Sequence, residues 1–218
     1  MTGPPRPSNR GRSNDPRLDE ALISAAIEVL NEVGYAAFTT AEVARRAGAS
    51  TASIYRRWPS KQALTAAVAS HIAAAELGDI DTGCLEGDLR ELLRRKQRIL
   101  DASAGPALLS LMGHAAHDTG LRRVLHDNVY RVTRKTLEDL TARAARRHEL
   151  DEGVDAAEVS IMALTLIGTA LARSVFVTSA RSQTPNERTT AEPDNAELEE
   201  VELRMLLRTF GSIAARHR

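Results

Sequence analysis

The sequence has little of what disulfide-bonded, secreted or β-sheet proteins need. Its single cysteine, Cys84, excludes a disulfide within the chain and fits a reducing compartment. Aromatic residues are only 3% of the chain, and abundant alanine and leucine favour helices over sheets. The N-terminus MTGPPRPSNRGRSNDP lacks the apolar segment of a signal peptide. The longest apolar run, residues 159–172, is too short to cross a bilayer and predicts a buried helix, so we expect a cytoplasmic protein with no membrane partner.

The chain also has no net charge, with 29 Lys and Arg against 29 Asp and Glu, but its charges are unevenly placed. Residues 1–17 hold four arginines and one aspartate, whereas residues 181–202 hold two arginines and seven acidic residues. A basic N-terminal end indicates contact with a polyanion. Residues 1–14 are predicted to be a disordered basic arm, which either enters a DNA minor groove or serves as an unbound solubilising tail.

No stretch of the sequence alternates with the period of a β-strand, so we expect an all-α fold. Glycines and prolines divide the helical patterns: Gly34 and Gly48 each end a helix, and Pro59 ends another. The loop GDIDTG at residues 78–83 is the predicted domain boundary. The predicted helices are residues 15–34, 39–48, 51–58, 60–76, 85–102, 105–117, 119–149, 155–181 and 195–216.

The stretch AEVARRAGASTASIYRRWPSKQAL, residues 41–64, contains two short helices joined by a turn at Gly48. Such a pair is a candidate helix-turn-helix, whose second helix enters the major groove of DNA. Val43, Ala44 and Ile54 have the spacing that packs the two helices together. A helical corner with solvated arginines is the alternative interpretation, and the whole run of residues in order favours DNA binding.

The other face of the second helix carries side chains suited to DNA. Thr51 and Ser53 can hydrogen-bond base edges or phosphates, and Ala52 can meet a thymine methyl. Arg56 can bind a guanine edge or a phosphate, and the rigid Tyr55 can offer its hydroxyl to a phosphate. This helix therefore has the composition of a DNA probe rather than of a core element.

Lys61 lies in the first turn of the following helix, directly after its predicted cap, Ser60. The helix dipole disfavours a cation at that end. A phosphate bound between the lysine and the free backbone N–H groups removes the conflict, which adds a phosphate site to the prediction.

This run of residues resembles the DNA-binding region of the TetR family of transcriptional regulators over about residues 18–72. The shared pattern consists of Gly34, Thr39-Thr40, Ala47-Gly48-Ala49-Ser50, Tyr55, Trp58, Ser60-Lys61 and Leu64. The rest of the chain resembles the family only in length and helical pattern.

The resemblance assigns roles by position. It implies phosphate contacts from Thr40, Tyr55 and Lys61, and base contacts from the helix that begins at Thr51. Ala41 is too short for the base contact that some members make there. Arg57 replaces a common histidine and is expected to serve a phosphate. The predicted DNA-binding residues are Thr40, Ser50, Thr51, Ala52, Ser53, Tyr55, Arg56, Arg57 and Lys61.

The last two predicted helices are candidates for dimerisation, because two copies related by a two-fold axis would read a palindrome. Gly168 and Ala172 have the small-xxx-small spacing that allows close helix approach. The resemblance implies that the two helices pair with their mates as a four-helix bundle, and packing within one chain is the alternative. The predicted dimer residues are Gly168, Ala172, Leu203, Leu206 and Phe210.

The resemblance also implies a small-molecule effector bound between helices of the C-terminal domain. Leucine and methionine at helical spacing supply an apolar lining, although plain core is the commoner meaning of such a stripe. The predicted lining residues are Leu93, Leu100, Leu109, Met112, Tyr130, Met162, Thr165, Leu166 and Thr169.

The sequence motifs do not indicate an enzymatic site or a metal site. The chain has no nucleophile elbow, phosphate loop or HExxH motif, so no catalytic residue and no cofactor is predicted. His114, His117 and His126 have Asp118 near two of them, but no cysteine lies nearby, and we predict no metal site.

Together these observations predict a dimeric, ligand-responsive regulator, most simply a repressor that binds a palindromic operator on double-stranded DNA. The predicted domains are a basic arm (1–14), a helix-turn-helix domain (15–59), a connecting helix (60–77) and a ligand-binding and dimerisation domain (78–218). Two alternatives remain: a DNA-binding regulator without an effector, and a helical protein-interaction module.

Overall fold

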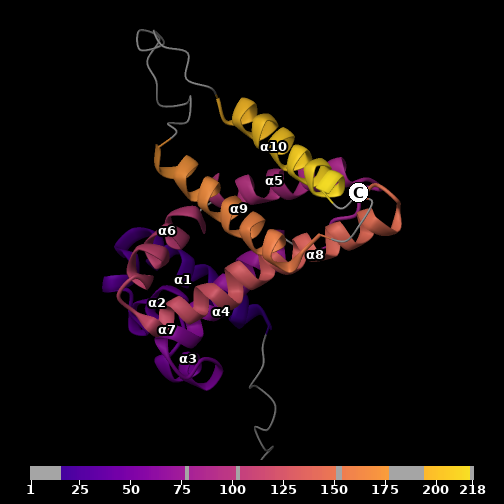
Figure 1. Ribbon diagram of the computed structural model, residues 1–218. Helices are drawn as coiled ribbons and strands as arrows, with labels where there is room; N and C mark the ends of the chain where they lie inside the picture. Colours follow the sequence, from indigo (N-terminus) through magenta and orange to yellow (C-terminus); the bar gives the residue numbers. More distant parts are fainter. Residues whose placement is uncertain (1–15, 77–78, 102–103, 151–153, 177–193, 217–218) are drawn as a thin grey trace, which may run out of the picture.

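The computed structural model describes residues 16–76, 79–101, 104–150, 154–176 and 194–216, and this part of the chain is helical without a strand (Figure 1). The all-α prediction is therefore confirmed. The predicted basic arm lies outside the described residues. The helices are α1 (Pro16–Ala37), α2 (Thr40–Arg46), α3 (Thr51–Arg57), α4 (Lys61–Glu76), α5 (Leu85–Asp101), α6 (Ala104–Ala115), α7 (Thr119–Leu125), the π-helical segment η1 (His126–Tyr130), α8 (Arg131–Arg146), α9 (Ala156–Phe176) and α10 (Asn195–Arg216).

Most predicted boundaries lie within a few residues of the observed ones, and the differences have local causes. Helical hydrogen bonding in α1 continues to Ala37, but Gly34 breaks the helical backbone with φ 69° and ψ 174°. The predicted stop at Gly34 is thus present as a kink, which needs a residue without a Cβ. The single helix predicted over 119–149 is interrupted by the π-helical turn at residues 126–130.

The first core gathers around α1 and belongs to both halves of the sequence. Leu22, Phe38 and Ile54 are fully buried in it, together with residues of α4. Leu111 of α6 and Leu121 of α7 are buried in the same cluster. Packing therefore crosses the loop that we predicted as a domain boundary, because α6 and α7 return to cover α1.

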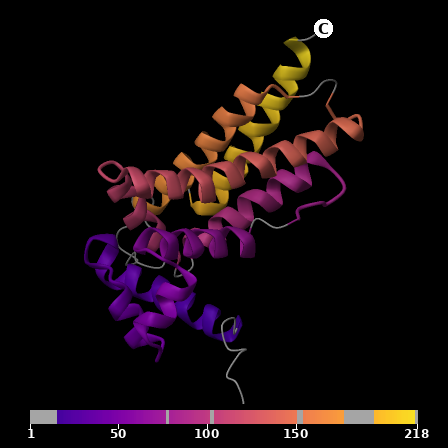
Figure 2. The same cartoon turned by 90° about the horizontal axis from the view of Figure 1, so that it is seen from below.

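The second core lies between α5, α8, α9 and α10. Leu89 and Leu92 of α5, Leu137 of α8, Leu166 of α9 and Leu203 of α10 are buried there. Figure 2 shows the N-terminal helices at one end of the molecule and α9 with α10 at the other. The helix-turn-helix and the last two helices are thus held at opposite ends, with α4 to α8 between them.

Candidate DNA-binding surface and effector cavity

Local caps set the geometry of α2 and α3. The hydroxyl of Thr39 accepts the Glu42 N–H (3.2 Å), and that of Ser50 accepts the Ser53 N–H (3.2 Å). Gly48 takes a φ of 63° in the turn between the helices, where a Cβ would be strained. The predicted caps at Thr39 and Ser50 are confirmed, so Ser50 has a structural task within the motif. Of the predicted capping box the structure shows the Thr39 half, while the Glu42 carboxylate binds Arg45.

The two helices pack through the residues that the spacing indicated. Val43 and Ala44 of α2 and Ile54 of α3 are buried in the first core. This packing turns the opposite face of α3 outward, so that Thr51, Ala52 and Arg56 are exposed and Ser53 is half-buried. The predicted base-facing residues therefore share one accessible face.

Thr40 and Tyr55 meet across the two helices. Their hydroxyl oxygens lie 3.1 Å apart, and either can donate to the other. Thr40 is buried, whereas Tyr55 is 51% exposed. One hydroxyl proton is used between them, and the other remains available for an acceptor such as a phosphate oxygen.

Arg57 is placed differently from the expectation. Its side chain is only 5% exposed and is ion-paired with Asp19 of α1. Its Nη1 donates to the backbone oxygen of Ser53 (3.2 Å). The predicted phosphate contact is wrong for this arrangement, because the guanidinium ties α3 to α1 instead of facing outward.

Lys61 also has a partner within the chain. Its ammonium donates to the Tyr35 backbone oxygen (2.6 Å) and lies 4.0 Å from the centroid of the Tyr35 ring. Burial lowers the pKa of Lys61, and the negative charge of Asp118 offsets part of this lowering. The carbonyl and the ring relieve the conflict with the helix dipole without a phosphate, so a phosphate contact from Lys61 stays a prediction.

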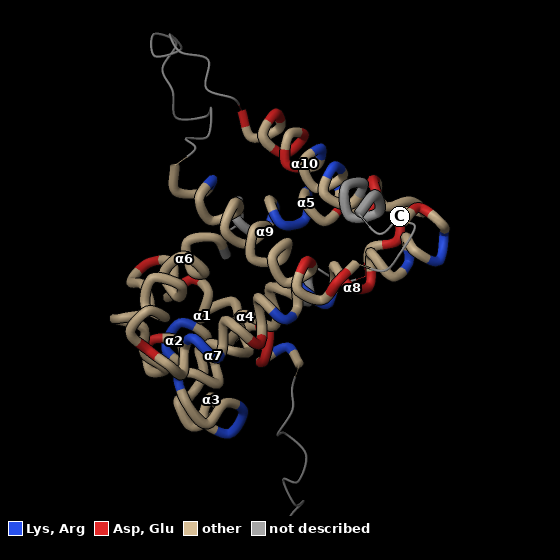
Figure 3. The backbone as a smooth tube through the Cα atoms, in the orientation of Figure 1, with Lys and Arg blue, Asp and Glu red and all other residues tan. Residues whose placement is uncertain are grey.

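The arginines of the motif divide into paired and outward-facing ones. On α2, Arg45 binds Glu42 (2.5 Å) and Arg46 binds Glu32 (2.6 Å). On α3, Arg56 is exposed and donates only a long hydrogen bond to Ser53 (3.3 Å). Figure 3 shows basic positions at the end of α3. Arg56 is therefore the α3 arginine that can reach a nucleic acid.

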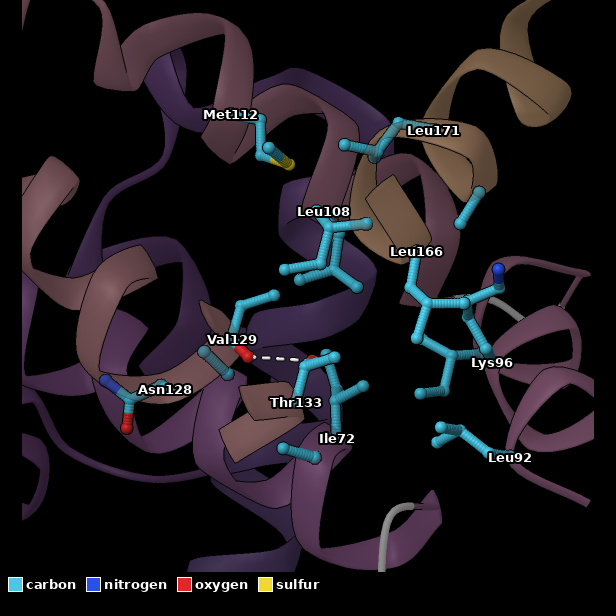
Figure 4. A pocket seen from close by; sticks show the side chains of 15 residues that line it. Ile72, Leu92, Lys96, Leu108, Met112, Asn128, Val129, Thr133, Leu166 and Leu171 are labelled. Atoms are coloured by element: carbon cyan, nitrogen blue, oxygen red, sulfur yellow. Dashed lines mark hydrogen bonds between the residues drawn. The ribbon is translucent and has the colours of Figure 1, made fainter. Parts of the chain in front are cut away.

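A cavity lies between six helical segments, α4, α5, α6, η1, α8 and α9, in the middle of the molecule (Figure 4). Its enclosed volume is about 80 Å³, below the range of drug-sized sites, and the cavity opens to solvent, so a longer ligand would extend into the opening. Its wall is almost entirely hydrocarbon. The lining residues are Ala69, Ile72, Ala73, Leu92, Lys96, Ile99, Leu108, Met112, Asn128, Val129, Thr133, Leu166, Ile167, Ala170 and Leu171.

Only Met112 and Leu166 of the predicted lining residues belong to this cavity. Leu93 and Tyr130 pack on the second core, and Leu109 is a half-buried residue of α6 outside the lining. The side chain of Leu100 lies outside the described residues. Met162, Thr165 and Thr169 line a groove between α9 and α10.

The sequence interpretation missed the contribution of α4 and of the polar residues in the wall. Ala69, Ile72 and Ala73 come from the helix that follows the helix-turn-helix. In the sequence these apolar residues have the pattern of an ordinary core. They line a cavity only because later helices pack against α4. Leu92 and Ile99 of α5 fit the expected apolar lining, and Lys96 could have been found with them, since the three residues share a helix face.

The outer face of α9 and α10 is apolar and exposed. Ile161 and Phe176 of α9 are 63% and 80% exposed, and Met205 of α10 is 63% exposed. By length and composition α9 could cross a membrane, and only 33% of its most apolar stretch is buried. The apolar run at residues 159–172 is thus part of a helix long enough to cross a membrane, and the expected burial holds on one face only, which includes Met162, Ala163 and Leu166.

The predicted dimer residues separate into two groups. Gly168 and Ala172 lie on the exposed face of α9. Leu203, Leu206 and Phe210 are buried in the second core, so Leu203 and Phe210 lie away from the outer face, whereas Leu206 also lines the groove between α9 and α10. Packing within one chain, the alternative interpretation, explains them. The groove between the helices is lined by Ile161, Met162, Thr165, Thr169, Ala172, Arg173, Leu198, Val201, Glu202, Met205, Leu206 and Thr209.

The architecture defines a class of protein: helical regulators with a helix-turn-helix at one end. The profile described as "Bacterial regulatory proteins, tetR family" matches residues 22–68, and that described as "Tetracyclin repressor-like, C-terminal domain" matches residues 79–184. The chain belongs to the TetR family of DNA-binding transcriptional regulators, and it is a regulator rather than an enzyme.

Individual relatives agree with this assignment. The chain is 30% identical to the uncharacterized HTH-type transcriptional regulator YdeS of Bacillus subtilis, over 71% of this chain and 77% of that protein. It is 39% identical to the DNA-binding transcriptional repressor TetR of Mycobacteroides abscessus, over 43% of this chain and 52% of the relative. The crystal structure of the regulator FadR of Bacillus subtilis with stearoyl-CoA shares the fold, with a TM-score of 0.66 and 16% identity over 86% of this chain and 97% of that chain.

Proposed function

We propose that the protein is a repressor that binds a palindromic operator as a homodimer and is released by a small apolar effector, in the cytoplasm. The relative that is named a repressor supports repression rather than activation. The neighbour with bound stearoyl-CoA supports an effector site in this fold.

DNA contact is assigned to the helix-turn-helix domain, residues 15–59. Thr51, Ala52 and Arg56 on the exposed face of α3 read base edges, and Ser53 assists from a half-buried position. The Thr40–Tyr55 hydroxyl pair binds a phosphate. Lys61 at the start of the connecting helix adds a phosphate contact when its ammonium leaves the Tyr35 carbonyl.

Dimerisation is assigned to the exposed faces of α9 and α10. Ile161, Leu164 and Phe176 of α9 and Val201 and Met205 of α10 are exposed large apolar side chains. Ile161, Val201 and Met205 line one groove between the two helices. A patch of this kind marks an interaction surface. A two-fold axis through it would place two copies of α3 on half-sites about 34–36 Å apart, or a multiple of that distance.

Helix α4 connects the effector cavity to the DNA-binding motif, and this connection is the main observation behind the proposal. Lys61 in the first turn of α4 contacts Tyr35 beside the helix-turn-helix, whereas Ile72 near its other end lines the cavity. A ligand that moves Ile72 thereby tilts the helix that supports α3. A coupling free energy of about 1–3 kcal/mol is enough to change operator occupancy.

Fluorescence anisotropy of the purified protein with duplexes tiled across the DNA flanking its gene tests the proposal. We expect tight, salt-sensitive binding to one palindromic duplex. Leu108→Trp, which fills the cavity, should retain this binding but lose release by any effector that releases the wild type. Weak, uniform binding to every duplex would contradict the operator.

The same assay separates the alternatives. A regulator without an effector would bind the operator with equal affinity in the presence of every compound. A helical interaction module would show no salt-dependent binding to any duplex.

A further inference from the structure

The cavity wall offers one charged side chain to a ligand. Among its polar lining residues, Asn128 donates to the Val124 backbone oxygen (2.8 Å) and Thr133 to the Val129 backbone oxygen (2.9 Å). The Asn128 side-chain oxygen also accepts a hydrogen bond from Ser70 of α4, so both side chains are already engaged with residues of the protein. Lys96 of α5 lies on the opposite side of the cavity, where its carbon stem forms part of the wall (Figure 4).

The Lys96 ammonium belongs to a buried ionic cluster between the cavity and α10, formed by Lys96, Thr169, Arg173 and Glu202. The Glu202 carboxylate accepts hydrogen bonds from Lys96 (2.8 Å), Thr169 (2.6 Å) and Arg173 (3.2 Å). The side chains of Lys96, Arg173 and Glu202 are all close to nine-tenths buried or more. This Glu202 cluster thus contains two cations and a single carboxylate.

One of the two cations therefore has no carboxylate of its own, and the other direct contacts of the cluster do not supply one. Arg173 also donates to the backbone oxygen of Asn195 (2.8 Å), which is neutral. The Arg173 Nε is buried without a hydrogen-bond partner. Glu199 attracts Lys96 only through space, and burial lowers the pKa of Lys96 in spite of Glu202 and Glu199.

An excess cation away from water is unfavourable unless a counter-charge joins it. A ligand carboxylate arriving from the cavity would supply that charge next to Lys96. A neutral ligand would leave the excess unchanged, and a cationic ligand would add to it.

We propose that the cavity selects an apolar molecule that carries one carboxylate, and that Lys96 is the residue that recognises it. This inference rests on the proposed function, in which the cavity is the effector site. Lys96 exchanges Glu202 for the ligand carboxylate, while Thr169 and Arg173 continue to hold Glu202. Because Glu202 also lines the groove between α9 and α10, the exchange reaches the face assigned to dimerisation.

Isothermal titration calorimetry with the full chain and three probes of equal chain length tests the selection. The probes are decanoate, decan-1-ol and decylamine, each below its micellar concentration. We expect decanoate to bind at least about tenfold tighter than decan-1-ol, as a charge-assisted hydrogen bond allows, and decylamine to bind most weakly.

Variants of the cluster identify the recognising residue. Lys96→Met should remove the preference for decanoate, with decan-1-ol binding within about twofold of wild type as the readout of an intact cavity. Lys96→Arg should keep the preference, and Glu202→Gln should strengthen decanoate binding because it frees Lys96. Lys135→Met is the matched control, since Lys135 is an exposed residue of α8 outside the cavity.

The outcomes separate this inference from the function on which it rests. Equal affinity of the wild type for the three probes, or an unchanged preference in Lys96→Met, would overturn the carboxylate selection and leave the effector cavity in place. Failure of all three probes to bind the wild type would overturn the effector cavity, and the carboxylate selection with it.

Discussion

The helix-turn-helix and the α9–α10 pair present opposite kinds of surface at the two ends of the molecule. On α3 the exposed side chains are short or basic, apart from Tyr55, whose ring carries a hydroxyl, and the aliphatic Ile54 is buried. On α9 and α10 large apolar side chains lie on both faces, so Leu203 is buried while Met205 is exposed. A surface that meets DNA must remain hydrated when free, whereas a surface that meets an identical copy can be apolar because the copy covers it.

The largest effect is expected from a charge placed on the apolar surface of α9 and α10. Met205→Glu places two glutamates in the proposed interface, and we expect the dimer dissociation constant to rise at least about a hundredfold. Operator binding should fall with it, because two half-sites are no longer read together. Analytical ultracentrifugation measures the change. Arg204→Glu, an exposed residue of the same helix outside the groove, is the control and should remain dimeric. A dimer of wild-type strength in Met205→Glu would place the interface elsewhere.

The two faces of α10 should respond differently to truncation. Leu203→Ala should lower the free energy of unfolding by about 2–5 kcal/mol, because it opens a cavity in the second core. Val201→Ala on the exposed face should cost less than about 1 kcal/mol in the same measurement. Urea denaturation in the Met205→Glu background removes the contribution of dimerisation. Equal losses for both variants would contradict the division of α10 into a core face and an outer face.

At the DNA-binding end, the adjacent residues Arg56 and Arg57 are expected to have different roles. Arg57→Ala should lower the free energy of unfolding by about 1–2 kcal/mol, since it removes the tie to Asp19, whose carboxylate is 37% exposed and stays solvated. Arg56→Ala should change stability by less than about 0.5 kcal/mol and weaken operator binding by about 1–3 kcal/mol. Thermal melting and anisotropy measure the two effects. The reverse pattern would mean that Arg57, not Arg56, faces the DNA.

The smallest effect concerns acid stability on α5. Hydrogen bonds from Arg94 and then Arg95 lower the pKa of Glu91 to about 2 from 4.5. A lowered folded-state pKa means that the contribution of ionised Glu91 is present above pH 4.5 and is lost as the pH falls towards 2. Because Arg94 is half-exposed, we expect a loss of only about 1 kcal/mol. Glu91→Gln should flatten this part of the stability–pH profile in urea denaturation, and an unchanged slope would contradict the assignment.

The helix-turn-helix was predictable because its information is local. The caps at Thr39 and Ser50, the glycine turn and the burial of Ile54 follow from residues within a few positions of one another. The failures there, Arg57 and in part Lys61, involve partners on α1, 38 and 26 residues away in the sequence. An arginine on a short helix has the same local pattern whether it faces a phosphate or an aspartate of another helix.

The C-terminal half was predictable in its helices but less so in the use of their faces. The pattern on α10 indicated which residues were apolar, yet could not distinguish those that cover α5 and α9 from those that face outward. Lys96 and Glu202 lie 106 residues apart, and nothing local indicates that they meet. The cavity depends in the same way on α4, whose small residues become a wall only after α6, α8 and α9 have packed around it.

The sequence by itself determined the helical fold, the caps and turn of the DNA-binding motif and, through that motif, the family. These properties depend on backbone propensity, hydrogen bonds between near neighbours and the order of a short run of residues. Only the tertiary structure decided which apolar side chains form the cores, the cavity and the outer face, and which charges are paired. Such choices depend on helices that are distant in the chain, because burial and ion pairing are properties of what surrounds a side chain and not of the side chain alone.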